Sequence, residues 1–428
     1  MWNKPKTSLV FSRTDYITYR QHSKIHQVNS MILTNRNDIL NRGVEEIIIR
    51  EEFIEKMDSK VPLRLKMGFD PSAPDIHVGH AVGLRKLRQL QEIGHKVVLI
   101  VGDWTAQIGD PSGRSQTRKM LSAEEVRANA ETYLQQFFKI IDKDRTEIRW
   151  QTEWFGDFNL TNVIELTSKF TVAQILARDD FAKRFSQNHP ISITELLYPL
   201  LQGYDSVAIQ SDVEFGGTDQ KFNLLVGREL QQMNDMDRQH CFIMPLLPGI
   251  DGIQKMSKSL GNYIGIAEPS TEIYGKVMSI PDDLIMPYFE YLTDVPSLEL
   301  NEMAEDLASG SYNPMEAKKR VAHNLVEQYH GLNDANDAQI FFEKTVQNRE
   351  TPDNIKTYRI PISSNGKIQK LSNLLVDSEM VSSAGEARRL IQQGAVKLDD
   401  QSVNKNILCS ELSPGILKVG KRKYLKLV

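Results

Sequence analysis

Cysteine is almost absent from this sequence. The 428 residues include two, Cys241 and Cys409, which are too few and too far apart to form a zinc site or a disulfide framework. Long apolar runs are absent too, since none approaches the roughly 20 residues that a membrane-spanning helix needs. The N-terminus also lacks the apolar segment of a secretory signal. We therefore expect a cytoplasmic protein with no membrane partner and no protein-bound metal site.

The sequence carries little net charge, but the charge is unevenly distributed. The formal net charge is −4, whereas residues 366–428 contain eleven Lys and Arg against six Asp and Glu. A basic C-terminal part on an acidic body indicates that a polyanion binds near the C-terminus. Ordinary variation in surface charge is the alternative interpretation.

Strand and helix patterns alternate along most of the chain. Alternating apolar residues predict a strand over 63–69, and a short apolar run predicts a buried parallel strand over 96–101. Residues 147–150 are a further candidate strand, and residues 241–244 are predicted to form the last core strand. Residues 213–220 have the pattern of a strand, a turn and the start of a helix. Helical spacing is found over 38–57, 78–93, 122–141, most of 160–206, and 268–346. This order predicts an α/β fold with a Rossmann-like, doubly wound parallel sheet and ligand-binding loops at the carboxyl ends of its strands.

The stretch from Asp70 to His80 lies where the first predicted strand gives way to a helix. Free N–H groups at a helix N-terminus favour anions, and Gly79 lets a ligand approach the backbone closely. His77 and His80 are three residues apart, so both can face one side of the first turn and donate to phosphate oxygens. The pattern indicates a phosphate site without a glycine-rich loop, although the four-residue pattern from His77 to His80 is weak evidence by itself.

A second motif, Lys255-Met256-Ser257-Lys258-Ser259, lies far downstream between two glycines. Two lysines among small hydroxyl residues predict a mobile cationic loop, whereas a stretch of this kind alone is usually a solvated turn. In this order and at this separation, the two motifs resemble the signature pair of class I aminoacyl-tRNA synthetases.

Further motifs resemble those of bacterial-type tyrosyl-tRNA synthetases, from about residue 35 to the C-terminus. They are Asp110-Pro111-Ser112-Gly113, Tyr198 with Gln202 and Asp205, and Gly216-Gly217-Thr218-Asp219-Gln220. The resemblance implies that ATP activates L-tyrosine to tyrosyl-adenylate with release of pyrophosphate. The tyrosyl group then passes to the 3′ end of tRNA(Tyr). The same resemblance implies a homodimer, Mg²⁺ on the ATP phosphates and no DNA partner.

The resemblance implies a role for each matching residue. His77, His80, Lys255, Lys258, Ser72 and Arg114 would act on the phosphates, with Arg118 as a further cation. ATP would contact Asp70, His77, Gly79, His80, Gly217, Asp219 and Lys258. Tyrosine would contact Asp110, Tyr198, Gln202, Asp205 and Gln220. In this assignment the Asp205 carboxylate accepts a hydrogen bond from the phenol hydroxyl.

The resemblance also implies the domain order. We expect an N-terminal extension over 1–34, a catalytic domain over 35–266 with a helical insertion at about 155–210, and an α-helical domain over 267–346. A linker over 347–365 and a small α+β RNA-binding module over 366–428 complete the chain. Residues 1–30 fit the rest poorly: Met31 is one candidate start, a disordered extension is another, and a targeting peptide is a weaker third.

The expected C-terminal module consists of two short helices and a hairpin starting at Val396. Ser383 and Glu386 form the pattern of a capping box at the start of the second helix. Arg388 and Arg389 would project outward from this helix and contact RNA.

Two positions depart from the best-known bacterial branch of the family. Lys66 stands where that branch has a tyrosine that touches the substrate hydroxyl, and Glu214 stands where it has glutamine. A second bacterial branch, with lysine at this position and an intact lysine motif, matches better. Recognition of the phenol would then depend on Asp205 and on a group that the sequence does not identify.

Two other functions compete with tyrosine ligation as interpretations of the sequence. A tryptophanyl enzyme has the nearest related fold, but Asp205 and the basic tail argue against it. An RNA-binding protein that has lost catalysis is the other alternative, and the intact histidines and lysines argue against that.

Overall fold

The structure is a computed structural model that describes residues 36–59, 61–72, 75–111, 121–348, 355–360, 369–420 and 423–428. The chain forms two compact units. The first comprises the chain up to Leu247 together with Glu290–Glu299, and the second comprises Pro248–Phe289 and Leu300–Val428. The lysine motif therefore lies in the second unit, whereas the expected catalytic domain extended to residue 266.

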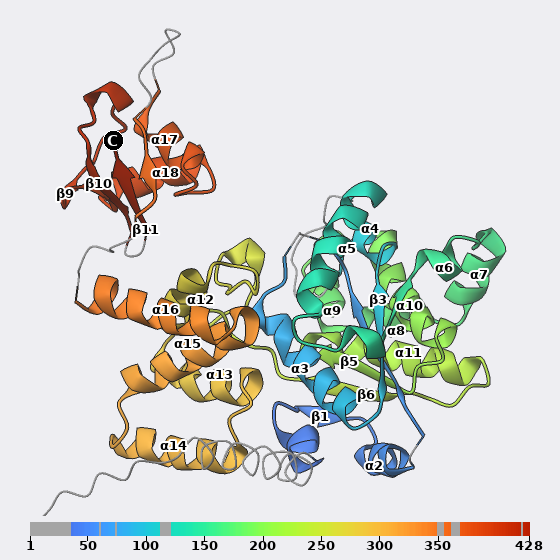
Figure 1. The fold of residues 1–428 in the computed structure, drawn as a ribbon. Helices are drawn as coiled ribbons and strands as arrows, with labels where there is room; N and C mark the ends of the chain where they lie inside the picture. The colour runs from blue at the N-terminus through green and yellow to red at the C-terminus, as the bar shows by residue number, and fades with distance from the viewer. Residues whose placement is uncertain are drawn as a thin grey trace, which may run out of the picture. The chain divides into compact units, whose positions relative to one another are not determined.

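The first unit is built on a six-stranded sheet in the order β1-β6-β5-β2-β3-β4 (Figure 1). Its strands are β1 (Glu46–Ile47), β2 (Arg64–Phe69), β3 (Lys96–Val101), β4 (Thr146–Trp150), β5 (Val213–Gly217) and β6 (His240–Met244). All neighbouring pairs are parallel except β1 with β6. The doubly wound parallel sheet predicted from the sequence is confirmed.

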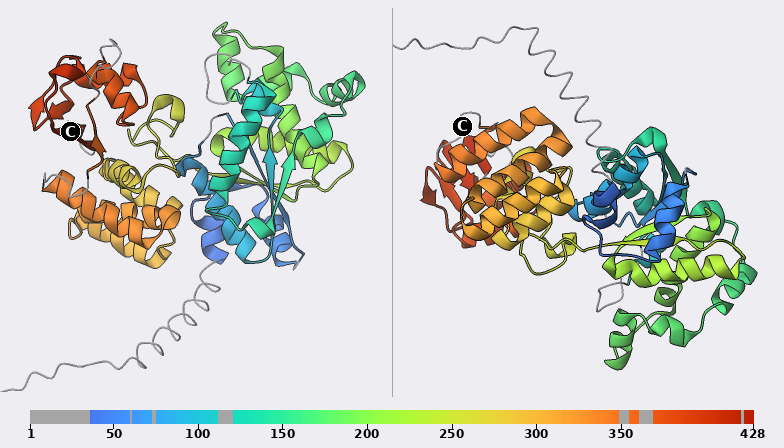
Figure 2. Two further views of the ribbon diagram at one scale, coloured as in Figure 1. Left: turned by 45° about the horizontal axis from the view of Figure 1, so that its top comes forward. Right: turned by 90° about the horizontal axis from the view of Figure 1, so that it is seen from below.

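Helices cover both faces of this sheet (Figure 2). On one face, α3 (Val78–Glu92) approaches so closely that a Cβ added at Gly83 would lie 3.0 Å from Met67. On this face Phe69 also packs edge-on against Phe137 of α5 (Ala123–Phe137). On the other face, α10 (Ile193–Ala208) contacts Lys66 of β2 and packs against α11 (Lys221–Met233).

Short helices connect β3, β4 and α10. They are α4 (Thr105–Ile108), α6 (Thr152–Phe155), α7 (Leu160–Ser168), α8 (Val172–Leu176) and α9 (Asp179–Ser186). Side chains from α7 to α9 share an apolar core with α10 and α11, including Leu166, Phe181 and Leu230. The stretch is helical, as its apolar spacing predicts.

The helix predicted over 38–57 is wrong. Residues 36–41 are helical, but the chain then turns at Gly43, whose φ is +62°. Strand β1 follows and pairs with β6, and α2 (Arg50–Asp58) begins only after Ile49, a left-handed residue with φ +56°. The apolar spacing resembled one helix because both short helices bury residues at helical intervals, while the strand between them is fixed by a partner about 200 residues away.

After the segment with the lysine motif, the second unit continues with helices, as predicted for 268–346. They are α12 (Ser270–Val277), α13 (Ile285–Leu292), α14 (Ser297–Ser309), α15 (Pro314–His330) and α16 (Leu332–Phe342). The last turns of α13 and the first of α14 belong to the segment that the first unit includes. Helices α12, α15 and α16 pack together around buried side chains such as Tyr274 and Val321.

The C-terminal part has a sheet of five strands in the order β7-β11-β10-β8-β9. These are β7 (Thr357–Tyr358), β8 (Val396–Leu398), β9 (Gln401–Ser402), β10 (Gly415–Val419) and β11 (Lys423–Leu427). The predicted hairpin is thus part of a larger sheet, and the expected linker contains β7, which pairs with β11. Helices α17 (Leu371–Asp377) and α18 (Ala384–Gln392) form a separate core with this sheet, as two helices were predicted.

A search of the described residues finds no helix long and apolar enough to cross a membrane.

Arg42 attaches the segment 290–299 to the rest of the first unit. Its guanidinium donates to the carbonyl oxygens of Glu290 at 2.7 Å, Val295 at 2.6 Å and Thr293 at 2.7 Å. Asp294 within this segment also binds Arg85 and Arg88 of α3. These contacts join a distant part of the chain to the helix that starts at the histidine motif.

We expect Arg42→Ala to lower the free energy of unfolding by about 2–4 kcal/mol, because hydrogen bonds from a charged group contribute roughly 1.5–3 kcal/mol each and do not add fully. The matched control is Arg36→Ala. Arg36 forms an exposed pair with Asp58 at 2.7 Å, and such pairs contribute about 0–1 kcal/mol. Chemical denaturation of the full chain measures both variants, and equal losses would contradict a special role for Arg42.

Candidate active site

The two motif histidines lie at the start of α3. His77 is the N-cap residue with φ −122°, so it precedes the first turn and does not lie within it. Its backbone N–H donates to Nδ1 of His80 at 3.3 Å, and the two ring centroids are 4.0 Å apart. Because Nδ1 of His80 accepts, the neutral ring carries its proton on Nε2 and presents a donor. Ser72 is exposed and Gly79 is half-buried nearby in the chain.

Asp70 follows β2 and is fixed by two hydroxyl groups. Tyr198 of α10 donates to Oδ2 at 2.8 Å, and Thr105 of α4 donates to Oδ1 at 2.7 Å. Burial raises the pKa of Tyr198 well above its usual value, and the Asp70 carboxylate adds to this effect. Gly102 allows this arrangement, since a Cβ there would lie 2.3 Å from Oδ1 of Asp70.

Asp205 is a buried carboxylate with side-chain donors on two sides. It is 2% exposed. Gln151 donates to both of its oxygens at 3.1 and 2.9 Å, and Nε1 of Trp154 donates to Oδ1 at 3.2 Å. The amide of Gln151 is oriented by its oxygen, which accepts from the backbone N–H of Thr105 at 2.9 Å. Burial raises the pKa of Asp205 to about 7, against the lowering effects of Lys66 and Gln151.

Asp110, Gln202 and Gln220 are joined through Asn223. Nε2 of Gln220 donates to Asp110 at 2.7 Å, while Nδ2 of Asn223 donates to Gln220 at 3.0 Å and to Gln202 at 2.9 Å. Arg178, buried on the other side, approaches Oδ1 of Asp110 at 3.4 Å and Oδ1 of Asn223 at 3.1 Å. The five residues predicted to bind tyrosine thus belong to two hydrogen-bond chains. One links Tyr198 to Asp205 through Asp70, Thr105 and Gln151, and the other links Asp110, Gln220 and Gln202 through Asn223.

Gly217 and Asp219 lie at the carboxyl end of β5, where Thr218–Gln220 form a short 3-10 turn before α11. A Cβ at Gly217 would lie 2.7 Å from Oδ1 of Asp219. The glycine therefore lets the Asp219 carboxylate lie directly over the end of the strand. Like Asp70 and Asp110, these residues follow the carboxyl ends of neighbouring parallel strands, so all four lie at the same edge of the sheet.

The lysine motif is held by Asn262. Its side chain accepts from the N–H of Ser257 at 2.8 Å and donates to Asp251 at 2.8 Å and to the carbonyl of Lys255 at 3.3 Å. Met256 is buried, whereas Lys255 is exposed and Lys258 is half-buried. The loop therefore has a fixed frame that presents its lysines, in the second unit.

Two remaining predictions concern arginines. Arg388 and Arg389 are exposed on α18, as predicted, with Ala387 and Ile391 buried on the opposite side. Arg114 and Arg118 lie outside the described residues, so their expected places are not tested.

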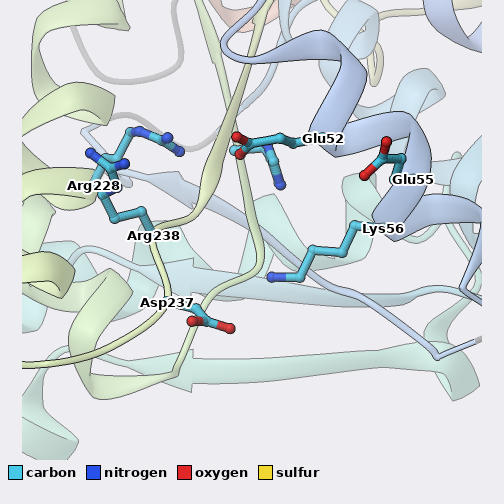
Figure 3. Close-up of a pocket in the computed structure, with 7 residues that line it drawn as sticks. Glu52, Glu55, Lys56, Arg228, Asp237 and Arg238 are labelled. Atoms are coloured by element: carbon cyan, nitrogen blue, oxygen red, sulfur yellow. The ribbon is translucent and has the colours of Figure 1, made fainter.

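A pocket in the first unit lies away from this edge. It has a volume of about 360 Å³ and is lined by residues of α2, α11, the loop after α11 and the start of β6, most of them charged (Figure 3). Glu52 and Lys56 face Arg228, Arg238 and Asp237 across it. His240 opens β6, so this pocket lies at the amino ends of the strands, away from the residues described above.

The sequence prediction missed several residues of the site, of which Gln151 and Trp154 contact Asp205. They follow the carboxyl end of β4, the same signal that identified Asp70 after β2. Thr105 and Asn223 were missed because a single polar residue in a helix gives no such signal.

The arrangement offers binding partners for three kinds of chemical group. Asp205 is a buried acceptor suited to a hydroxyl group, and the carboxylate of Asp110 is suited to an ammonium group. The histidines at a helix N-terminus are suited to phosphate oxygens. In the part of the chain that the structure describes, no three His, Cys, Asp or Glu side chains are grouped so that they could hold a metal ion.

Comparison with protein families gives two matches. Residues 58–347 match the family described as "tRNA synthetases class I (W and Y)", and residues 369–407 match the S4 domain. Among similar proteins, the tyrosine–tRNA ligase of Dehalococcoides mccartyi is 55% identical over 398 residues, covering 92% of this chain and 99% of that protein. The tyrosine–tRNA ligase of Carboxydothermus hydrogenoformans is 48% identical over 403 residues, covering 92% and 98%.

Solved structures show the same fold. A mitochondrial tyrosyl-tRNA synthetase of Aspergillus nidulans, truncated at its C-terminus, superposes with a TM-score of 0.60 at 22% identity, covering 73% of this chain and 92% of that one. The tyrosyl-tRNA synthetase of Archaeoglobus fulgidus in complex with L-tyrosine gives 0.59 at 24% identity, covering 72% and 99%.

We expect Gly102→Ala to lower the free energy of unfolding by about 1–3 kcal/mol, the usual effect of overpacking, because the new methyl group would displace Asp70 or Thr105. Gly68→Ala is the matched control, since its Cβ would have 4.0 Å to Ile100, and should change stability by less than about 0.5 kcal/mol. Thermal unfolding of both variants tests this. A Gly102→Ala protein as stable as wild type would show that the Asp70 contacts are loosely held.

Proposed function

The chain belongs to the class I tRNA synthetase family of tryptophan and tyrosine enzymes, and we propose how its site carries out the tyrosine–tRNA ligase reaction. ATP activates L-tyrosine to tyrosyl-adenylate and pyrophosphate, and the tyrosyl group is transferred to the 3′ end of tRNA(Tyr). The observation that carries this function is the buried carboxylate of Asp205, which Gln151 and Trp154 hold by hydrogen bonds. Asp205 lies on α10, the helix that also bears Tyr198 and Gln202.

We propose that Asp205 accepts a hydrogen bond from the phenol hydroxyl of tyrosine. The ionised carboxylate is suited to this because it is an acceptor on both oxygens, and its two donors leave lone pairs for a third. Gln151 and Trp154 hold the carboxylate in place, and we propose that recognition of the phenol depends on them as well as on Asp205. A tryptophan substrate would present no hydroxyl to this acceptor.

The α-ammonium group of tyrosine is proposed to bind Asp110, Tyr198 and Gln202, with Gln220 beside the carboxyl group. Asp110 supplies the negative charge, and Gln220 and Asn223 keep its position. On the ATP side we propose Asp70, Gly79, Gly217 and Asp219.

Attack of the tyrosine carboxylate on the α-phosphate needs no protein nucleophile. It needs alignment of the two substrates and stabilisation of charge on the departing pyrophosphate. We propose that this charge is stabilised by donors from both motifs and the loop after β3: His77, His80, Ser72, Lys255, Lys258 and Arg114. Mg²⁺ would enter on the phosphates of ATP as part of that substrate.

The C-terminal S4 domain supports binding of tRNA. We propose that Arg388 and Arg389 contribute to it, since both are exposed on one side of α18. We also propose a homodimer. Apolar side chains are exposed on and near α7 to α10, namely Leu160 at 73%, Ile164 at 58%, Val172 at 63% and Ile193 at 78%, and a second copy would cover them. We place the chain in the cytoplasm, where its two unbridged cysteines stay reduced.

Exchange of labelled pyrophosphate into ATP tests the function directly. It should depend on tyrosine and give no signal with tryptophan. His80→Ala and Lys258→Ala should each reduce the rate about 10²–10³-fold, the usual effect of losing a transition-state donor. Tyrosine affinity should change little, because neither group faces the amino acid in this proposal. The controls are His189→Ala, at an exposed position, and Lys169→Ala, at a half-buried position as Lys258 is. Tryptophan-dependent exchange would overturn the function.

Asp205 predicts an acidic limb in the pH profile. Its pKa of about 7 lies above the ordinary value, so the carboxylate loses its charge as the pH falls through 7. We therefore expect kcat/KM for tyrosine to fall about tenfold per pH unit below that value. Asp205→Asn should remove the limb and lower the preference for tyrosine over phenylalanine roughly ten- to hundredfold, the effect of losing a hydrogen bond to a charged group. A folded variant with unchanged preference would remove Asp205 from the pocket.

A further inference from the structure

Lys66 lies on β2 and is fully buried. Glu214 of β5 is its register partner on the neighbouring parallel strand, so both side chains emerge on the same face of the sheet. Nζ of Lys66 lies 2.9 Å from Oε1 of Glu214, and the two side chains are 0% and 1% exposed. The chain thus places a charged pair in the interior, under α10.

The ammonium group of Lys66 has three N–H donors, and the structure gives each of them an acceptor. These acceptors are Oε1 of Glu214, the carbonyl oxygen of Gln202 at 2.8 Å and Oγ of Ser206 at 2.8 Å. No donor is left for a ligand. Lys66 therefore does not take over the direct contact to the substrate that the tyrosine at this position makes in the other bacterial branch.

Glu214 is equally occupied. It accepts from Nε2 of Gln202 at 3.2 Å and from the hydroxyl of Ser206 at 3.1 Å, and Gln239 donates to its second oxygen. The pair therefore holds Gln202 twice, once by the backbone carbonyl and once by the side-chain amide.

Helix α10 has no space to move against this pair. A Cβ at Gly227 of α11 would lie 2.9 Å from Oγ of Ser206 and 3.2 Å from Glu214, so α11 packs directly over the contact. Tyr198, Gln202 and Asp205 lie at positions i, i+4 and i+7 of α10 and share one side of it. The pair forms hydrogen bonds with α10 at Gln202 and Ser206. Gln202 is itself proposed to bind tyrosine, and Ser206 directly follows Asp205.

We propose that Lys66 and Glu214 are positioning residues for tyrosine: the pair fixes α10 on the sheet so that Gln202 and Asp205 face the amino acid. This proposal rests on the proposed function. It assigns to Lys66 an indirect role in specificity, exerted through α10.

Two charged groups face Asp205 from the strands under α10. Lys66 favours the ionised carboxylate and Glu214 opposes it, while the side chains on its other side, Gln151 and Trp154, are uncharged. The effect of Lys66 on the pKa of Asp205 is the larger of the two. Changing either charge should therefore move the ionisation of Asp205, and in opposite directions.

A purely structural role is the competing interpretation, because breaking a buried ion pair destabilises a protein whatever its function. Substrate-specific kinetics separate the two. We expect Lys66→Met and Glu214→Gln each to raise KM for tyrosine at least tenfold and to change KM for ATP less than twofold in pyrophosphate exchange. The double variant should show less than the product of the two single effects, since both single changes remove the same contact.

The pH profile gives a readout that structural damage would not produce. The midpoint of the acidic limb of kcat/KM for tyrosine should rise in Lys66→Met and fall in Glu214→Gln. Lys66→Arg, which keeps the charge, should leave it near the wild-type value. Lys86→Met is the matched control: Lys86 is also buried and donates to two carbonyl oxygens, of Asp38 and Arg42, but it lies on α3. It should lower stability without moving KM for tyrosine or the midpoint.

Midpoints that shift in the same direction, or not at all, would overturn the opposite effects of the two charges on Asp205. An unchanged KM for tyrosine would overturn the proposal that the pair positions α10 for the amino acid. If Lys66→Met does not fold, Lys66→Arg and Glu214→Gln still decide the question. A wild-type chain without tyrosine-dependent exchange would instead refute the proposed function, so the two failures are distinguishable.

Discussion

The first unit depends on one constraint, the burial of hydrogen-bonded polar side chains between α10 and the sheet. Leaving such a group unpaired costs about 1–3 kcal/mol, and more when it is charged. Asp205 and Lys66 are both buried, so their partners must be at the right distance at the same time. The amide nitrogen of Gln151 points at Asp205 because its amide oxygen accepts a hydrogen bond at the start of α4. The positions of α4, α6 and α10 are therefore coupled through a few hydrogen bonds, and this coupling gives the site one geometry.

Much of the fold could be predicted because central parallel strands are buried on both faces and appear as apolar runs, as β3 and β6 do. The residues after the strands were predictable for a related reason, since parallel strands bring their carboxyl ends to one edge. Strand β1 could not be predicted. It has two residues, and its pairing with Ile243 and Phe242 depends on a part of the chain far away in sequence.

Lys66 shows the same limit inside the site. A lysine in an alternating strand pattern predicts a solvent-facing position, and nothing near it in sequence indicates otherwise. It is buried because β2 pairs with β5, which brings Glu214 alongside from 148 residues away. A local sequence pattern therefore predicts the exposure of a charged strand residue correctly only where the neighbouring strand supplies no opposite charge to pair with it.

The proposed site residues differ in exposure according to what they would bind. Asp205 and Tyr198 are buried, whereas Ser72 and Lys255 are exposed and the two histidines are half-buried. Discrimination between similar amino acids requires a hydrogen-bonding group that water cannot satisfy in place of the substrate, so the selective acceptor must be buried. Phosphates carry enough charge to be attracted by exposed cations, and pyrophosphate must leave after the reaction. In the proposed site, burial of the group that selects the substrate and exposure of the groups that meet the leaving pyrophosphate are thus two consequences of the same hydration energetics.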